Sequence, residues 1–201
     1  MKKRLAVLIS NTGTGTNLQA IINGIESKKI NAIIVLVLSD TEKSLGLTRA
    51  KKYNLPIKIV PKKEGLLIVF KQFDPDFICL AGWKQIIVDK VIDAYENRIL
   101  NIHPGLIPDT PNSAILNPDN TTALWNKGKL TDAAIKNYFD HHSTYAGSSI
   151  HFLTHEFDFG PVLGRCFEKI KTRDTIDTLY ARLKIKENQL CQNVLQKLCD
   201  E

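Results

Sequence analysis

Short apolar runs alternate along this chain with segments of helical periodicity, and no other feature limits the possible folds as strongly. The runs lie at residues 5–10, 33–38, 57–60, 77–81 and 98–102. Strands that are apolar on both faces and alternate with helices are typical of a parallel sheet covered on both sides. The sequence therefore predicts an α/β protein: a Rossmann-like, mostly parallel sheet with helices on both faces.

The helices between these runs are predicted from their spacing. After the first run, Leu18, Ile21, Ile22 and Ile25 recur at i, i+3, i+4 and i+7, as on one face of a helix. Further helices are expected at 45–53, 66–73 and 86–95. The length of 201 residues favours one domain spanning 1–201.

From residue 104 to 147 the pattern is lost, and the chain becomes rich in Pro, Asn, Asp and Thr. Only 121–126 and 131–139 suggest helical turns, so we expect a long functional loop with an atypical insert at about 109–146. Regular patterning returns with strands at 148–153 and 161–170. Asp174 is the expected N-cap of a last helix, whose apolar stripe is Ile176, Leu179, Leu183, Leu190, Val194 and Leu198.

Composition excludes several classes of protein. With 43% hydrophobic and 24% charged residues, the chain can bury a core, and we see no export or membrane-spanning segment. Its net charge of +6 is spread without a dense basic tract, so a phosphorylated small substrate explains it as well as nucleic acid does. The four cysteines have no CxxC spacing and are expected to be reduced, as in the cytoplasm.

A glycine-rich loop at 10–19 stands between the first strand and the first helix. Glycines and the free N–H groups of a helix start can hold a phosphate. The spacing does not match GxGxxG and lacks the lysine of a nucleotide P-loop, so neither a dinucleotide site nor an NTPase is supported. A plain tight turn is the alternative.

Asn101 and His103 end the last parallel strand. Residues at i and i+2 of a strand project to the same face, and Pro104 ends the strand there. The carboxyl edge of such a sheet is where ligands bind. An amide beside an imidazole suits a reaction that develops an oxyanion and moves a proton, although a hydrogen-bonded strand end is the simpler reading.

Two carboxylates occur where apolar surroundings are expected. Asp158 lies in a turn with two phenylalanines, and Glu187 falls on the apolar stripe of the last helix. A desolvated Asp158 needs a partner such as His103. Asp158 could instead stabilise its own turn, and Glu187 could form a buried salt bridge instead of binding a ligand hydroxyl.

Together these segments resemble the glycinamide ribonucleotide transformylase family of folate-dependent enzymes. The resemblance covers most of 4–107 and 147–198, through LIS before the glycine loop, TNLQAII, LAGW, LNIHPGLIP and SSIHFLTHEFDFGPV. It implies the formyltransferase fold and transfer of a formyl group from 10-formyltetrahydrofolate to glycinamide ribonucleotide in purine synthesis. It also implies a cytoplasmic monomer or homodimer that takes small-molecule substrates, without nucleic acid, membrane or metal.

Carried over position by position, the resemblance implies three sets of site residues. The catalytic residues would be Asn101, His103 and Asp158. The acceptor phosphate would bind to Gly15, Thr16 and Asn17, and its ribose hydroxyls to Glu187. The folate pocket would be lined by Gln85, Ile87, Thr154, His155, Glu156 and Phe157, with Ser149 and His151 supporting the turn at 154–158.

The chain also departs from the family. Lys84 replaces an apolar residue, Phe159 replaces a small one, and 109–146 is longer than usual. Rival functions are formyl transfer to another amine such as an amino-sugar nucleotide, hydrolysis of the formyl folate, or phosphometabolite binding without catalysis. A binder would not need Asn, His and Asp together. The insert is expected over the mouth of the site, with Trp125, Tyr138 and Phe139 folding over a ligand, and a remote surface insert is the alternative.

Overall fold

The structure, a computed structural model, describes residues 1–10 and 14–200. Asn11, Thr12 and Gly13 of the predicted glycine loop therefore lie outside the described residues. The chain groups into two compact units: residues 1–101 with the chain from Cys191 onward, and residues 102–190. The single domain expected from the length stays a prediction.

The first unit contains the parallel strands. They are β1 (Lys3–Ile9), β2 (Ala32–Ser39), β3 (Ile57–Ile59), β4 (Phe77–Leu80) and β5 (Ile99–His103), which runs across the boundary between the units. Their order is β3-β2-β1-β4-β5, with every pair parallel. The central strand β1 is buried from its third residue to its last, as expected for a strand covered on both faces.

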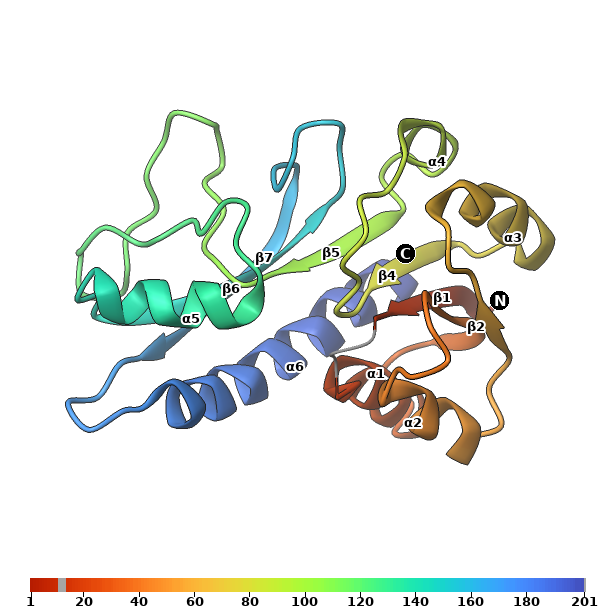
Figure 1. The fold of residues 1–201 in the computed structure, drawn as a ribbon, viewed down its shortest axis with the longest axis horizontal. Coiled ribbons are helices and arrows are strands. Elements are labelled where there is room, and N and C mark those ends of the chain that lie inside the picture. The colour runs from red at the N-terminus through yellow and green to blue at the C-terminus, as the bar shows by residue number, and fades with distance from the viewer. Residues whose placement is uncertain (11–13, 201) are drawn as a thin grey trace. The chain divides into compact units, whose positions relative to one another are not determined.

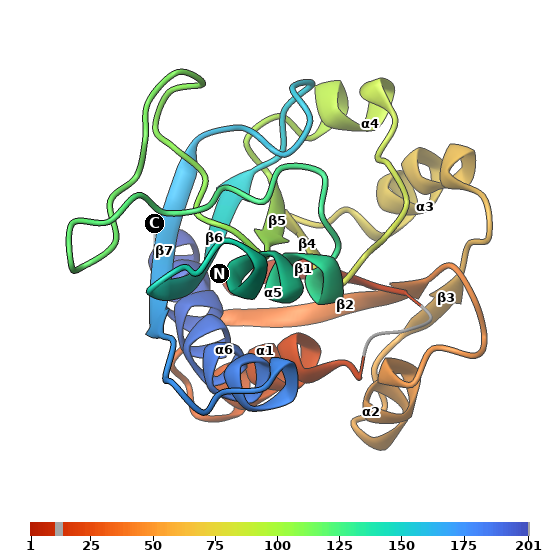
Figure 2. The ribbon, with the colours of Figure 1, turned by 60° about the vertical axis from the view of Figure 1, so that its left-hand side comes forward.

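Helices cover both faces of this part of the sheet. They are α1 (Thr16–Glu26), α2 (Gly46–Lys52), α3 (Leu66–Phe73) and α4 (Asp89–Ala94), with a 3-10 turn η1 (Lys63–Gly65) before α3. Figures 1 and 2 show α1 and α2 on one face and α3 and α4 on the other. The helix predicted at 86–95 begins only at Asp89, because Val88 has an extended backbone with ψ of 147°.

In the second unit the pairing changes direction. Here β6 (Tyr145–Phe152) follows β5 in the sheet and pairs antiparallel with β7 (Val162–Lys169). The helix α5 (Thr131–Asp140) contributes Ile135 and Tyr138 to a core with Ala146, Leu179 and Leu183. The α/β fold and the mostly parallel sheet predicted from the sequence are thus confirmed.

The last helix is α6 (Ile176–Asp200). With Asp174 as the predicted N-cap it would begin at residue 175, one residue earlier than observed. Thr175, and not Asp174, caps it, because the Thr178 N–H donates to Thr175 Oγ1 at 3.2 Å. Asp174 instead accepts a bidentate pair of bonds from Arg182, at 2.6 and 2.7 Å. Ile176, predicted on the apolar stripe, is 43% exposed.

Residues 104–130 contain no helix, so the turn predicted at 121–126 is wrong. Leu116 and Thr122 instead form an antiparallel bridge, and the Ala123 N–H donates to the Ile115 carbonyl at 2.8 Å. Asn120 adopts φ of 66°, which a short polar side chain tolerates in a tight turn. Within residues 1–10 and 14–200, no helix has the length and apolar character needed to cross a membrane.

Candidate active site

His103 is the last residue of β5, and its side chain is only 2% exposed. Its Nε2 lies 2.7 Å from the Trp125 carbonyl oxygen, and its Nδ1 lies 3.6 Å from Asp158 Oδ1. A carbonyl oxygen can only accept a hydrogen bond, so Nε2 carries a hydrogen. Nδ1 is therefore the ring atom that can take up or release a proton beside Asp158.

The turn that follows β6 brings Asp158 to the imidazole. Asp158 has φ of 50°, a left-handed conformation that aspartate tolerates. Its Oδ2 accepts from the Gly128 N–H at 2.7 Å, and its carbonyl accepts from Trp125 Nε1 at 3.0 Å. Thr154 Oγ1 closes the turn by donating to the Phe159 carbonyl at 2.8 Å.

The environment keeps Asp158 ionised. Burial by itself would raise the pKa of its carboxyl, but His103 and the Gly128 amide outweigh burial and hold that pKa below its usual value. The neighbouring His151 is fully buried, and this burial, with the charge of His103, lowers the pKa of its imidazole to about 4. His151 is thus neutral near pH 7, while Asp158 is a carboxylate.

Asn101 precedes His103 by two positions on β5 and pairs in register with Leu80 of β4. Side chains two positions apart on a strand leave the same face of the sheet, as the sequence predicts for this pair. Its catalytic role stays a prediction.

At the predicted phosphate loop, Gly15 is the N-cap residue of α1, with φ of 72°. A Cβ there would lie 2.7 Å from the Gly46 Cα, so both the conformation and the space require glycine. Arg49 supports the loop by donating from Nε to the Thr14 carbonyl at 3.0 Å. Asn17 is buried, and its Oδ1 has no hydrogen-bond partner among the described residues. This oxygen can only accept a hydrogen bond, so it is no partner for a phosphate, and phosphate binding by Asn17 stays a prediction.

Glu187 is buried on α6, as its position on the apolar stripe of this helix predicted. Ser148 Oγ donates to its Oε2 at 2.8 Å, and Lys184 Nζ lies 2.5 Å from its Oε1. The buried salt bridge considered from the sequence is therefore present. Binding of ribose hydroxyls by Glu187 stays a prediction.

The residues expected around the folate differ in exposure, from buried to more than half exposed. Gln85 donates from Nε2 to the Pro61 carbonyl at 3.2 Å, and Ile87 is buried. Of the turn residues, Phe157 is 56% exposed, and Glu156 pairs with Lys127 at 3.4 Å. His155, like Thr154, belongs to this turn. Folate binding by these residues stays a prediction.

Ser149 supports a different segment from the one expected. Its Oγ donates to the Gly105 carbonyl at 2.7 Å and accepts from the Ile107 N–H at 3.0 Å. It therefore fixes the chain just after β5 and not the turn at 154–158. His151 has its Nδ1 3.0 Å from the Phe152 carbonyl, next to that turn.

Sequence reasoning missed how Trp125, Gly105 and Gly128 contribute to the site. Trp125 was expected in a lid, but its carbonyl contacts His103 directly. The pattern gave no signal for this, because the part of the insert around Trp125 has no periodicity. Of the other aromatic residues expected over a ligand, Tyr138 is fully buried and donates to the Gly147 carbonyl, so it cannot fold over one. Phe139 packs against the core of the second unit.

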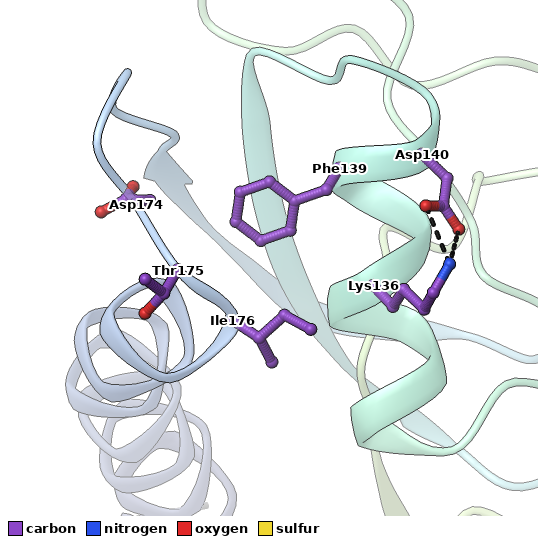
Figure 3. A pocket seen from close by; sticks show the side chains of 6 residues that line it. All are labelled: Lys136, Phe139, Asp140, Asp174, Thr175 and Ile176. Atoms are coloured by element: carbon purple, nitrogen blue, oxygen red, sulfur yellow. Dashed lines mark hydrogen bonds and ion pairs between the residues drawn. The ribbon is translucent and has the colours of Figure 1, made fainter.

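A pocket of about 320 Å³ lies elsewhere in the second unit, between α5 and the start of α6 (Figure 3). Its charged groups are already paired: Lys136 with Asp140, and Asp174 with Arg182. Of its six lining residues, only Phe139 was expected near the site, as part of the lid. Across the part of the chain that the structure describes, no group of three His, Cys, Asp or Glu residues is placed to hold a metal.

An α/β fold with a His–Asp pair at the end of β5 is typical of an enzyme. Comparison of the chain with known proteins shows to which family it belongs. Residues 3–195 match the family described as formyl transferase, and the chain belongs to this family. The phosphoribosylglycinamide formyltransferase of Escherichia coli strain K12 is 30% identical over 98% of this chain and 87% of its own length.

Two further comparisons agree. A solved structure of glycinamide ribonucleotide transformylase 1 from Geobacillus kaustophilus superposes with a TM-score of 0.81, at 28% identity over 99% of this chain and all of that one. The trifunctional purine biosynthetic protein adenosine-3 of Bos taurus is 29% identical over 97% of this chain. The chain spans only 18% of that longer relative.

Proposed function

We propose that the protein transfers the formyl group of 10-formyltetrahydrofolate to the amine of glycinamide ribonucleotide, a step of purine synthesis. The observation that carries this proposal is the His103–Asp158 pair at the carboxyl end of β5 in a member of the formyl transferase family. The names of the relatives at 28% to 30% identity support the choice of acceptor.

In the proposed reaction the acceptor amine attacks the formyl carbon, and a tetrahedral oxyanion forms. Asn101 and protonated His103 stabilise this charge, because donors aimed at a developing oxyanion lower the barrier. The new C–N bond remains, the bond from the carbon to the folate nitrogen breaks, and the proton of the amine passes through water to that nitrogen. Asp158, held as a carboxylate, orients the imidazole and assists the proton transfer.

The remaining site residues bind the two substrates in this proposal. Gly15, Thr16 and Asn17 hold the acceptor phosphate at the start of α1, and Glu187 meets the ribose hydroxyls. The folate lies against the backbone around Gln85 and Ile87 and the turn at 154–157. All four cysteines are free thiols, which fits the reducing cytoplasm, and we place a monomeric or homodimeric enzyme there.

The test is to incubate the protein with 10-formyltetrahydrofolate and glycinamide ribonucleotide, following the folate absorbance and the mass of the ribonucleotide product. We expect a product heavier by one formyl group that requires both substrates. His103→Ala serves as the inactive control. Formate release without the acceptor would instead identify a hydrolase, and formylation of an amino-sugar nucleotide alone would identify a different transferase.

A further inference from the structure

Segment 124–128 of the insert is hydrogen-bonded to the chain immediately after β5. The Trp125 carbonyl accepts from His103 Nε2 at 2.7 Å. The Leu124 carbonyl accepts from the Leu106 N–H at 2.9 Å, and Asn126 Nδ2 donates to the Pro104 carbonyl at 3.0 Å. The segment is thus bonded to three of the four residues from 103 to 106.

The same segment also holds Asp158. Trp125 Nε1 donates to the Asp158 carbonyl at 3.0 Å, and the Gly128 N–H donates to Asp158 Oδ2 at 2.7 Å. The Trp125 ring lies 5.8 Å from the Phe159 ring, centroid to centroid, and Lys127 Nζ lies 4.6 Å above the Trp125 ring. One residue, Trp125, therefore bonds to both members of the pair, through its carbonyl and through its indole.

Gly105 makes this close approach possible. A Cβ at position 105 would lie 1.8 Å from the Trp125 carbonyl oxygen and 2.6 Å from its carbonyl carbon. Such distances are far below van der Waals contact, and the obstacle is backbone, which cannot rotate away. Any larger residue at 105 would push segment 124–128 off His103.

We propose that Trp125 is a positioning residue for the transfer reaction: its carbonyl fixes the ring of His103, and its indole N–H fixes the Asp158 turn. The bond to Nε2 keeps a hydrogen on that nitrogen and holds Nδ1 next to Asp158 Oδ1. The catalytic consequence rests on the proposed function, whereas the hydrogen bonds do not depend on it.

The first variant is Gly105→Ala, which displaces the Trp125 carbonyl without altering any side chain of the pair. We expect kcat to fall by about 10²-fold, as for a catalytic group misplaced by about 1 Å, while KM for both substrates changes less than threefold. Gly65→Ala is the matched control, because its added Cβ meets only a valine side chain at 3.2 Å. The control should keep the kcat of the wild type.

The second variant, Trp125→Phe, removes the indole N–H together with one of the two fused rings, and it keeps the carbonyl and a six-membered aromatic ring. It should fold even if Gly105→Ala does not. We expect a smaller fall in kcat, by about threefold to tenfold, which is the range for one lost hydrogen bond.

Nitrogen-15 NMR of histidine-labelled protein gives a readout that needs no activity. The wild type should show a His103 Nε2 proton that is shifted downfield and protected from exchange, and Gly105→Ala should lose it. Wild-type kcat in both variants, or a protected Nε2 proton in folded Gly105→Ala, would overturn the proposal. An inactive wild type that shows the protected proton would refute the proposed function while supporting the positioning of His103 by Trp125.

Discussion

At the scale of single residues, the site depends on two neighbouring ionisable groups, His103 and Asp158, that have different hydrogen-bond partners. His103 meets an acceptor at each ring nitrogen, whereas Asp158 receives a backbone N–H and faces the imidazole. These contacts outweigh burial and keep the Asp158 pKa low. A carboxylate that stays ionised can orient a charged imidazole through a whole turnover.

We therefore expect Asp158→Asn to lower kcat by about 10²-fold or more, because it keeps the shape and the bond from Gly128 but removes the charge. Replacing His103 or Asn101 by Ala should lower kcat to a similar extent. Steady-state kinetics at saturating substrates, together with circular dichroism, measure this effect on folded protein. Near-normal turnover in any of the three variants would exclude that residue from the chemistry.

His151 gives a prediction for stability against pH. Its pKa is about 4 in the folded protein and about 6.5 in the unfolded chain, so between these values the unfolded chain binds more protons. The free energy of unfolding should therefore fall as the pH drops from 6.5 to 4, by up to about 3 kcal/mol. Urea unfolding at several pH values should show a shallower slope for His151→Gln than for the wild type. His155→Gln, which alters an exposed histidine, should keep the wild-type slope.

At the scale of elements, periodicity predicted most of the first unit. The helix predicted at 66–73 matches α3, and the buried strands match β1 to β5 within two residues. Such elements can be predicted from the local sequence pattern, because each helix has one apolar face and each buried strand has two. The predicted start of α6 was wrong because Asp174 and Thr175 are both good caps. Asp174 pairs with Arg182, eight residues further on in α6 itself, and leaves the cap to Thr175.

Loss of the actual cap should weaken α6. Thr175→Ala removes the acceptor for the Thr178 N–H and should lower the free energy of unfolding by about 1 kcal/mol. Thr175→Ser keeps a hydroxyl and should recover most of this loss. Both values come from urea denaturation at equilibrium, and equal stability of Thr175→Ala and the wild type would show that the hydroxyl does not cap the helix.

At the scale of the whole molecule, the insert is less uniform than its composition suggested. Its last part forms α5 and lies in the core of the second unit, while 124–128 contacts His103 and Asp158. Residues 115–123 instead form a mostly exposed hairpin, with Asn117 buried, that is closed by the bridge of Leu116 with Thr122. Periodicity identified α5, which was predicted at 131–139. It could not separate 124–128 from the hairpin, because the contacts of 124–128 are to residues distant in the sequence. Closure of the insert over bound substrates stays a prediction.

Removing the hairpin would break the hydrogen bond between the Oγ1 atoms of Thr121 and Thr144, at 2.7 Å, but it leaves the bonds of segment 124–128 to His103 and Asp158 in place. The Ala123 N–H already donates to the Ile115 carbonyl, so a two-residue Asn-Gly turn in place of 116–122 matches the bond that closes a tight hairpin. We expect this variant to keep its kcat within about threefold of the wild type, since every contact of segment 124–128 remains, and one lost hydrogen bond sets this scale. Thermal unfolding checks that the second unit is intact. A large loss of kcat in folded protein would show that the hairpin itself acts on the site, and a rise in KM for the ribonucleotide alone would assign it to acceptor binding.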